Sequence, residues 1–210
     1  MKPLMLIGGG GHCRSVIEAA ESAGLEIRGI LDTADKVGEN ILGYPVLGTD
    51  TDIPAMADQA DFIVTVGHIK DSSVRKKLAG MVKLAGGTLG TVVASTAHVS
   101  RHARIGAGTV VLHGAIVNAG AVVGENNIIN TLANIEHDAE TGDFCHISTG
   151  AMVNGGCRIG QDVFLGSQSV LLNGTDIPDG CVVAAGSFVR KSIRVKGIYA
   201  GNPAVLMKKL

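Results

Sequence analysis

A histidine between two carboxylates is the residue of this sequence best suited to proton transfer. His137 lies between Glu136 and Asp138, and none of the other six histidines has such neighbours. Histidine exchanges a proton near neutral pH, and an adjacent carboxylate can fix its tautomer and stabilise its positive charge. His137 is therefore the candidate general base, the alternative being a surface histidine in a polar turn.

A glycine-rich stretch near the amino terminus has the composition of a phosphate-binding loop. It follows an apolar run, residues 2–7, and precedes apolar residues at helical spacing over 15–23. Glycines let a backbone approach a pyrophosphate, whose charge is stabilised by N–H groups at the start of a helix. The candidate binding residues are Gly9, Gly10, Gly11 and His12. The alternative is a tight turn without a ligand.

A carboxylate follows this loop at the spacing found in nucleotide-binding βαβ units. Asp32 closes a second apolar run, residues 26–31, about twenty residues after the glycines; an acidic residue there can meet a ribose hydroxyl. Cys13 occupies the position of the third fingerprint glycine, which argues against a full dinucleotide. The expected ligand is a nucleotide.

The second half of the chain has a six-residue repeat that must position His137. From Val99 to Val189 an aliphatic residue returns at every sixth position except Thr141, and a small residue follows four positions later in nearly every repeat, with Asn127 the only amide. This period fits a three-sided solenoid in which three hexads make a coil of eighteen residues and stacked coils share one core. We expect the aliphatic residue to point inward and the small residue to turn the corner.

One coil separates His137 from Gly155. A small residue with exposed backbone is therefore expected beside the base, where N–H groups can donate to a bound group.

Composition agrees with a narrow solenoid. Glycine makes up 30 of 210 residues, tryptophan is absent and aromatic residues are 3%. The net charge of −1 gives no indication of nucleic-acid or membrane partners, and no apolar run reaches the length of a membrane span. The four cysteines lack zinc or redox spacing. We expect a cytoplasmic protein.

The first domain, residues 1–94, is expected to be a three-layer α/β unit of parallel strands, and residues 95–210 the solenoid with its tail. A third strand is expected over 62–66 and ends at Gly67. A helix is expected over 72–84, and we expect its basic face, Arg75 to Lys77, to be solvated. A last strand is expected over 88–93.

Together these motifs resemble the nucleotide-sugar acetyltransferases of the bacterial sialic-acid and bacillosamine type. G-G-G-G-H follows the first strand, L-D the second and V-G the third, and the solenoid carries Asn130-Thr131 and Glu136-His137-Asp138. The tail Tyr199–Ala204 resembles the G-x-P-A ending of hexapeptide acyltransferases. That ending usually continues with Lys or Arg, whereas this chain has Val205; Lys208 or Lys209 could substitute in a phosphate contact.

The resemblance implies a Rossmann-like α/β domain followed by a left-handed parallel β-helix. It also implies acetyl-CoA as co-substrate without a metal, and a homotrimer with active sites between neighbours. It assigns the base to His137 and the orienting carboxylate to Asp138. It places Gly67 and Asn130 at the nucleotide sugar, and it places along coenzyme A the residues His146, Gly155, Ser167 and Ala185.

The implied activity is acetyl-CoA-dependent N-acetylation of a nucleotide-linked aminosugar, such as a UDP-4-amino-4,6-dideoxy sugar, in bacterial surface glycan or glycoprotein biosynthesis. A sialic-acid or other sugar O-acetyltransferase is the alternative, and the nucleotide base stays open. Two remoter alternatives are a non-catalytic scaffold and a zinc-dependent hydratase, although His113, His137 and His146 lack the close histidine pair of β-helical carbonic anhydrases.

Overall fold

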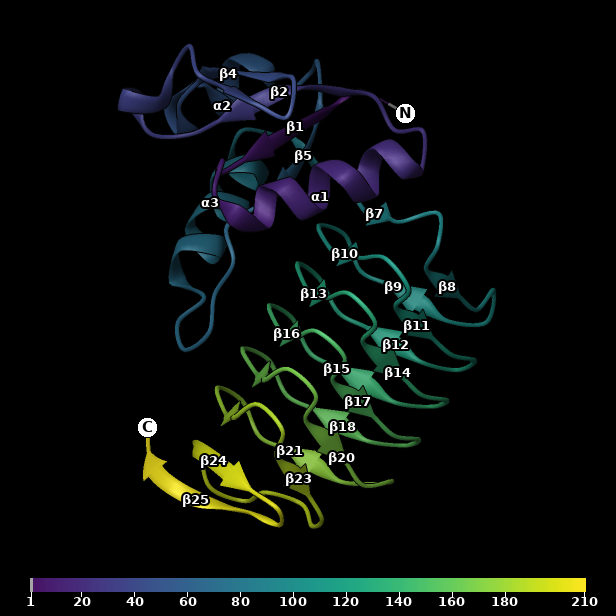
Figure 1. The fold of residues 1–210 in the computed structure, drawn as a ribbon. Helices are drawn as coiled ribbons and strands as arrows, with labels where there is room; N and C mark the ends of the chain where they lie inside the picture. The colour runs from purple at the N-terminus through teal and green to yellow at the C-terminus, as the bar shows by residue number, and fades with distance from the viewer. Residues whose placement is uncertain (1) are drawn as a thin grey trace.

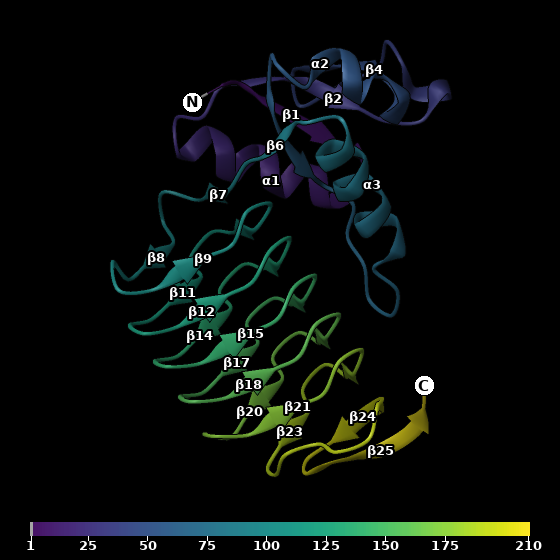
Figure 2. The ribbon, with the colours of Figure 1, turned by 180° about the vertical axis from the view of Figure 1, so that it is seen from behind.

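The computed structural model describes residues 2–210, which form an α/β domain stacked on the amino end of a solenoid (Figures 1 and 2). The α/β sheet has the strand order β3-β4-β2-β1-β5-β6, parallel except for the β3–β4 pair. Its strands are β1 (Leu4–Ile7), β2 (Ile27–Leu31), β3 (Asn40–Ile41), β4 (Tyr44–Gly48), β5 (Asp61–Val64) and β6 (Thr88–Leu89). Its helices are α1 (Gly11–Ser22), η1 (Ala34–Lys36), η2 (Asp50–Asp52), α2 (Ile53–Met56) and α3 (Ser73–Leu84).

Alternate residues of β1 pack on opposite faces of this sheet, as the pleat of a strand requires. Leu4 and Leu6 pack with α1, whereas Met5 and Ile7 pack with α3. The α1 side also includes Val110 and Ile128 of the solenoid. Helix α1 therefore lies between the sheet and the first coils, and its buried face joins the two domains (Figure 1).

The solenoid has three parallel faces, which we number in the order the chain visits them. The first face contains β7 (Val92–Val93), β10 (Val110–Val111), β13 (Ile128–Ile129), β16 (His146–Ile147), β19 (Phe164–Leu165), β22 (Val182–Val183), β24 (Gly197–Gly201) and the antiparallel β25 (Ala204–Lys209). The second face contains β8 (His98–Val99), β11 (Ile116–Val117), β14 (Asn134–Ile135), β17 (Met152–Val153), β20 (Val170–Leu171) and β23 (Phe188–Val189). The third face contains β9 (Arg104–Ile105), β12 (Val122–Val123), β15 (Glu140–Thr141), β18 (Arg158–Ile159) and β21 (Asp176–Ile177).

This arrangement confirms the predicted fold class, because each hexad forms one strand and strands eighteen residues apart pair in register. The small residues lie at the corners as expected, and the structure adds a residue in the left-handed conformation at each corner. The small residues, such as Ala115 and Ala121, are buried inside the corners, and the residue before each one takes a positive φ. Every sixth residue from Gly108 to Gly186 has this left-handed conformation, including Asp138 at +59°.

Asn127 and Thr141, the two residues that depart from the hexad pattern, contact each other. Asn127 is fully buried, and its amide donates to Thr141 Oγ1 at 3.1 Å and to Gly142 O at 2.9 Å. Its carbonyl oxygen accepts the Cys145 N–H. Burying the amide is tolerated because its donors and its acceptor are satisfied.

Two local expectations were wrong. The expected strand over 88–93 is two strands: β6 pairs with β5, and β7 is the first strand of the solenoid. The change of sheet thus falls between Leu89 and Val92, a few residues before the expected domain boundary. Arg75 is 1% exposed rather than solvated.

Across residues 2–210, neither the length nor the apolar character of any helix suffices to cross a membrane.

Candidate active site

The glycine loop lies at the carboxyl ends of β1 and β2, the edge of an open α/β sheet where ligands bind. The Gly9 N–H donates to Asp32 Oδ2 at 2.8 Å, and a Cβ atom at Gly9 would lie 2.6 Å from that oxygen. Helix α1 begins at Gly11 with Gly10 as its N-cap and no side-chain cap. The loop therefore presents helix N–H groups to an anion beside a fixed carboxylate.

An apolar cavity of about 190 Å³ opens at the same edge, between α3 and η2. Its lining residues are Ile7, Gly8, Leu31, Asp32, Thr33, Asp50, Val66, Val74 and Leu78. Aliphatic walls with carboxylates at two positions suit a nucleobase and its ribose. The cavity, Asp32 and the glycine loop together form a candidate nucleotide site.

Arg75 holds the end of β5 against the solenoid. Its guanidinium donates to Val64 O at 2.8 Å, to Val66 O at 2.6 Å and, across the domain junction, to Asn126 O at 2.9 Å. All three acceptors are backbone carbonyls, and burial lowers the pKa of Arg75 to about 10. The side chain thus remains a buried cation close to the glycine loop.

Three histidines surround this cation. Burial, with a smaller contribution from Arg75, lowers the pKa of His12 to about 3 and that of His68 to about 4. Burial also lowers the pKa of His146. Nε2 of His12 and both ring nitrogens of His68 are buried without a partner. At neutral pH the three rings are uncharged.

These pKa shifts predict acid sensitivity. A histidine whose pKa is lowered by folding stabilises the protein above its unfolded pKa, near 6.5, and that stability is lost as the pH falls, because the unfolded chain binds more protons. We expect each such histidine to lower the free energy of unfolding by about 1.4 kcal/mol per pH unit below about 6.5. Urea unfolding at pH 7, 6 and 5 measures this slope.

The His12→Gln variant should show a shallower slope than the wild type, whereas His102→Gln, which changes an exposed histidine, should keep it. Equal slopes for the wild type and His12→Gln would contradict the neutral, buried state of His12.

His146 connects the solenoid to the loop between β5 and α3. Its Nδ1 lies 2.8 Å from His68 O and must carry a proton, since a carbonyl oxygen only accepts. Its Nε2 therefore accepts from Asn130 Nδ2 at 3.1 Å, and Asn130 Oδ1 accepts the Thr131 N–H at 2.8 Å. These bonds fix the tautomer of His146 and occupy both of its nitrogens.

His137 stands at the corner between the second and third faces. Its Nδ1 lies 2.9 Å from Asp138 Oδ2, and the two side chains are 63% and 73% exposed. Its Nε2 lies over Gly155, where a Cβ atom would approach to 2.6 Å. We expected the backbone at Gly155 to be exposed, but Gly155 is buried because the imidazole of His137 covers it. The neighbouring Gly156 N–H donates to His137 O.

Glu136, the other flanking carboxylate, is already occupied. It accepts hydrogen bonds from Asn134 Nδ2 and Asn118 Nδ2, both at 3.0 Å. The Asn134 bond is the main cause of the lowered pKa of Glu136. Asp138 is therefore the carboxylate that contacts the ring, at Nδ1, and Nε2 lies on the side away from it.

The expected site residues fall into two groups on opposite edges of the second face. The corner between the second and third faces carries His137, Asp138 and Gly155. The corner between the first and second faces carries Asn130, Ser167 and Ala185, with His146 on the first face and Gly67 in the loop beside it. Within one chain, the strands of the second face lie between these two corners.

Sequence reasoning missed His68 and Arg75 as members of the site. His68 directly follows Gly67 at the end of a strand, which was a usable signal. Arg75 gave none, because its burial depends on the solenoid carbonyl of Asn126. Among the side chains of residues 2–210, no group of three or more His, Cys, Asp or Glu is placed to hold a metal ion.

The chain matches the family model of the PglD N-terminal domain over residues 3–82 and that of the hexapeptide repeat of succinyl-transferase over residues 156–191. It is 31% identical to the acetyltransferase domain of PglB from Neisseria gonorrhoeae, with a TM-score of 0.90 and coverage of 99% of this chain and 100% of that one. It is 30% identical to a histidine-to-asparagine variant of perosamine N-acetyltransferase from Caulobacter crescentus in complex with CoA and GDP-perosamine, with a TM-score of 0.92 and coverage of 100% and 98%.

An uncharacterised protein of Acanthamoeba polyphaga mimivirus is 32% identical over 139 residues, which are 66% of this chain and 23% of that protein. The chain thus spans about a quarter of the mimiviral protein's length.

A glycine-loop α/β domain stacked on a hexapeptide solenoid with an exposed His–Asp pair defines an acetyltransferase of the hexapeptide-repeat class. The chain belongs to the family of nucleotide-sugar acetyltransferases that includes the PglB domain and the perosamine enzyme. The predicted family and enzyme class are confirmed.

Proposed function

We propose that the protein transfers the acetyl group of acetyl-CoA to the amino group of a nucleotide-linked aminosugar, with His137 as general base. The observation that carries this proposal is the imidazole held by Asp138 with its Nε2 directed over Gly155. Related structures contain acetyl coenzyme A, or CoA with GDP-perosamine, which supports both substrates. The four unpaired cysteines suit a reducing compartment, and the proposed location is the cytoplasm.

The proposed reaction is direct transfer. The sugar amine attacks the thioester carbonyl, a C–N bond forms, and the nitrogen becomes cationic. His137 Nε2 accepts the ammonium proton while Asp138 stabilises the imidazolium. The C–S bond then breaks, and the coenzyme leaves as its thiolate, which takes the proton from the His137 imidazolium and so restores the base. His146 binds rather than catalyses in this scheme, because both of its nitrogens are occupied.

The two groups of site residues are proposed to meet between copies of the chain in a homotrimer. If the second faces surround a threefold axis, the His137 corner of one copy lies against the Ser167 and Ala185 corner of the next, because these corners are the two edges of the same face. Cyclic symmetry closes such a contact. The second face and its corners expose the apolar side chains Ile116, Leu132, Met152 and Leu172, which supports burial of this surface.

Asp32→Ala tests the nucleotide half of the proposal. The change removes the carboxylate that accepts the Gly9 N–H at 2.8 Å and the Thr33 N–H at 2.8 Å. We expect affinity for the nucleotide sugar to fall about tenfold or more, as for loss of a charge-assisted hydrogen bond. Affinity for coenzyme A should change little. Calorimetry with UDP-, GDP- and CMP-sugars, and separately with coenzyme A, measures both and identifies the base.

Asp32→Asn is the matched control, because it keeps an oxygen for the loop while removing the charge. An equal loss of affinity for both ligands in Asp32→Ala would contradict the assignment of the nucleotide to the first domain.

A further inference from the structure

The loop between β5 and α3, residues 65–72, connects the α/β domain with the solenoid at the candidate site. It carries Gly67 and His68, and it contains no strand or helix of its own. Residues 69–71 are exposed. A segment with few buried contacts and no backbone ladder has low local stability. The position of this loop therefore depends on a small number of polar contacts along it.

Two of these contacts lie at the start and the middle of the loop. Arg75 donates to Val66 O at 2.6 Å, and His146 Nδ1 donates to His68 O at 2.8 Å. The ring of His146 also packs against those of His68 and Phe164, with ring centres 5.7 and 5.2 Å apart. Because a carbonyl oxygen only accepts, the position of His68 O determines that the proton of neutral His146 is on Nδ1.

Asp162 of the solenoid makes the third contact, at the end of the loop. One of its carboxylate oxygens accepts the hydroxyl of Ser72, which is buried, and the other lies 2.5 Å from Lys76 Nζ. Ser72 is the N-cap residue of α3, and Lys76 lies in the first turn of that helix. Asp162 thus attaches the junction of loop and helix to the solenoid, in part through a charge-assisted bond.

Helix α3 lies along the corner between the third and first faces. Steps of eighteen residues along this corner lead from Asn126 to Phe144 and Asp162, which take positive φ values of +55°, +56° and +59°. Arg75 donates to Asn126 O at 2.9 Å, and Lys76 Nζ lies 5.5 Å from the centre of the Phe144 ring. Three successive coils therefore contact the helix, and Asp162 belongs to the coil that also contacts the end of the loop.

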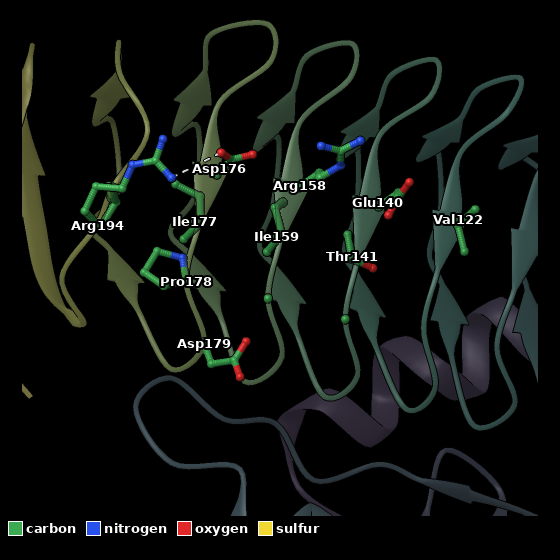
Figure 3. Close-up of a pocket in the computed structure, with 13 residues that line it drawn as sticks. Val122, Glu140, Thr141, Arg158, Ile159, Asp176, Ile177, Pro178, Asp179 and Arg194 are labelled. Atoms are coloured by element: carbon green, nitrogen blue, oxygen red, sulfur yellow. Dashed lines mark hydrogen bonds and ion pairs between the residues drawn. The ribbon is translucent and has the colours of Figure 1, made fainter.

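The carboxylates of the third face do not have this role. Figure 3 shows Arg158 between Glu140 and Asp176, along a groove of about 660 Å³. Asp176 lies 3.5 Å from Arg194 of the same face. Opposite charges on neighbouring strands stabilise a sheet locally. A carboxylate of this face therefore acts within the solenoid, whereas Asp162 connects the solenoid with the α/β domain.

We propose that Asp162 is a positioning residue for acetyl transfer. By holding the end of the β5–α3 loop, it keeps His68 O against His146 Nδ1, and His146 Nε2 is thereby left as the acceptor that orients the Asn130 amide. Asp162 itself lies at the opposite edge of the first face from Asn130. The inference rests on the proposed function, since it takes His146 and Asn130 to bind the two substrates.

The first test is nitrogen-15 NMR of the histidine-labelled protein at neutral pH, with the His146 signals assigned by their loss in His146→Gln. The wild type should show a protonated Nδ1 and an unprotonated Nε2. Asp162→Ala should show a mixture of the two tautomers, because the released loop no longer holds a carbonyl at Nδ1. Asp176→Asn, the matched change on the third face, should keep the wild-type signals. The wild-type tautomer alone in Asp162→Ala would overturn the proposal.

Steady-state kinetics distinguish positioning from folding. The side chains of Lys76 and Asp162 are 42% and 25% exposed, and ion pairs near the surface contribute little to global stability. Asp162→Ala should therefore keep nearly the wild-type melting temperature, while KM for both substrates rises about two- to tenfold, as for loss of one hydrogen bond. The value of kcat should change little, because His137 is untouched.

Asp162→Asn keeps an oxygen for Ser72 and removes the charge that pairs with Lys76. Its KM values should lie between those of the wild type and Asp162→Ala, and it decides the question if the alanine variant does not fold. Wild-type KM values in both variants would overturn the proposal. The NMR signals need no turnover, so a protein without acetyl transfer would contradict the proposed function and leave the tautomer result as an independent finding.

Discussion

His137→Ala should lower kcat by about 10²–10⁴-fold, the usual contribution of a general base. The amine gains a positive charge as it attacks the thioester, so a proton must leave while the C–N bond forms. His137 Nε2 is the free nitrogen placed for this, since Nδ1 faces Asp138 at 2.9 Å. KM for both substrates should change little, because the ring acts mainly in the transition state. Steady-state rates at saturating substrate measure the effect.

Asp138→Asn is the matched control for the orienting carboxylate. Asparagine tolerates the left-handed conformation that Asp138 adopts at φ +59° and keeps an oxygen for Nδ1. A smaller loss of kcat than in His137→Ala is therefore expected. Near-wild-type turnover in His137→Ala would exclude His137 as the base.

Ile159→Asp should unfold the solenoid. Ile159 is 4% exposed and points into the core shared by the coils. An unpaired buried carboxylate costs several kcal/mol, which is comparable with the total stability of a typical domain, about 5–15 kcal/mol. Circular dichroism and urea unfolding of the purified variant measure the loss.

Ile159→Val separates the charge from the loss of packing, because it removes only one methylene. That change should cost about 0.5–1.5 kcal/mol and leave a cooperative transition. A melting temperature unaltered by Ile159→Asp would contradict the register in which every sixth aliphatic residue faces inward.

The solenoid could be predicted because its period is a local property of the chain. One inward aliphatic residue per hexad determines the strand, the face and the coil, so the eighteen-residue step alone placed Gly155 beneath His137. The residues that adopt the left-handed conformation at the corners were harder to predict from the sequence. Leu132, Phe144 and Gln168 take positive φ without being Gly, Asn or Asp, because pairing of the flanking strands imposes the corner on them.

The junction between the domains could not be predicted, because its contacts join residues far apart in the chain. Arg75 lies on a helix that looks basic and solvated, yet its guanidinium reaches Asn126 O, 51 residues away. His146 and His68 O, 78 residues apart, are joined in the same way. The sequence of neither segment indicates its partner. The cluster of Arg75 and the three histidines beside the glycine loop could therefore be identified only from the structure.

The separation of the site residues between two corners also could not be predicted from local sequence. The phase of a residue within the eighteen-residue period gives its corner, but how corners of different copies meet depends on the assembly.

The most direct test of the central claim is the chemical nature of the acetylated product. The protein is incubated with acetyl-CoA and a UDP- or GDP-linked 4-amino sugar, release of the coenzyme thiol is followed, and the product is analysed by mass spectrometry before and after hydroxylamine. The account predicts thiol release that depends on the aminosugar and on His137, and an acetyl group that survives hydroxylamine, as an amide does. An acetyl group removed by hydroxylamine, which marks an ester on a sugar hydroxyl, or thiol release without any dependence on the aminosugar, would contradict it.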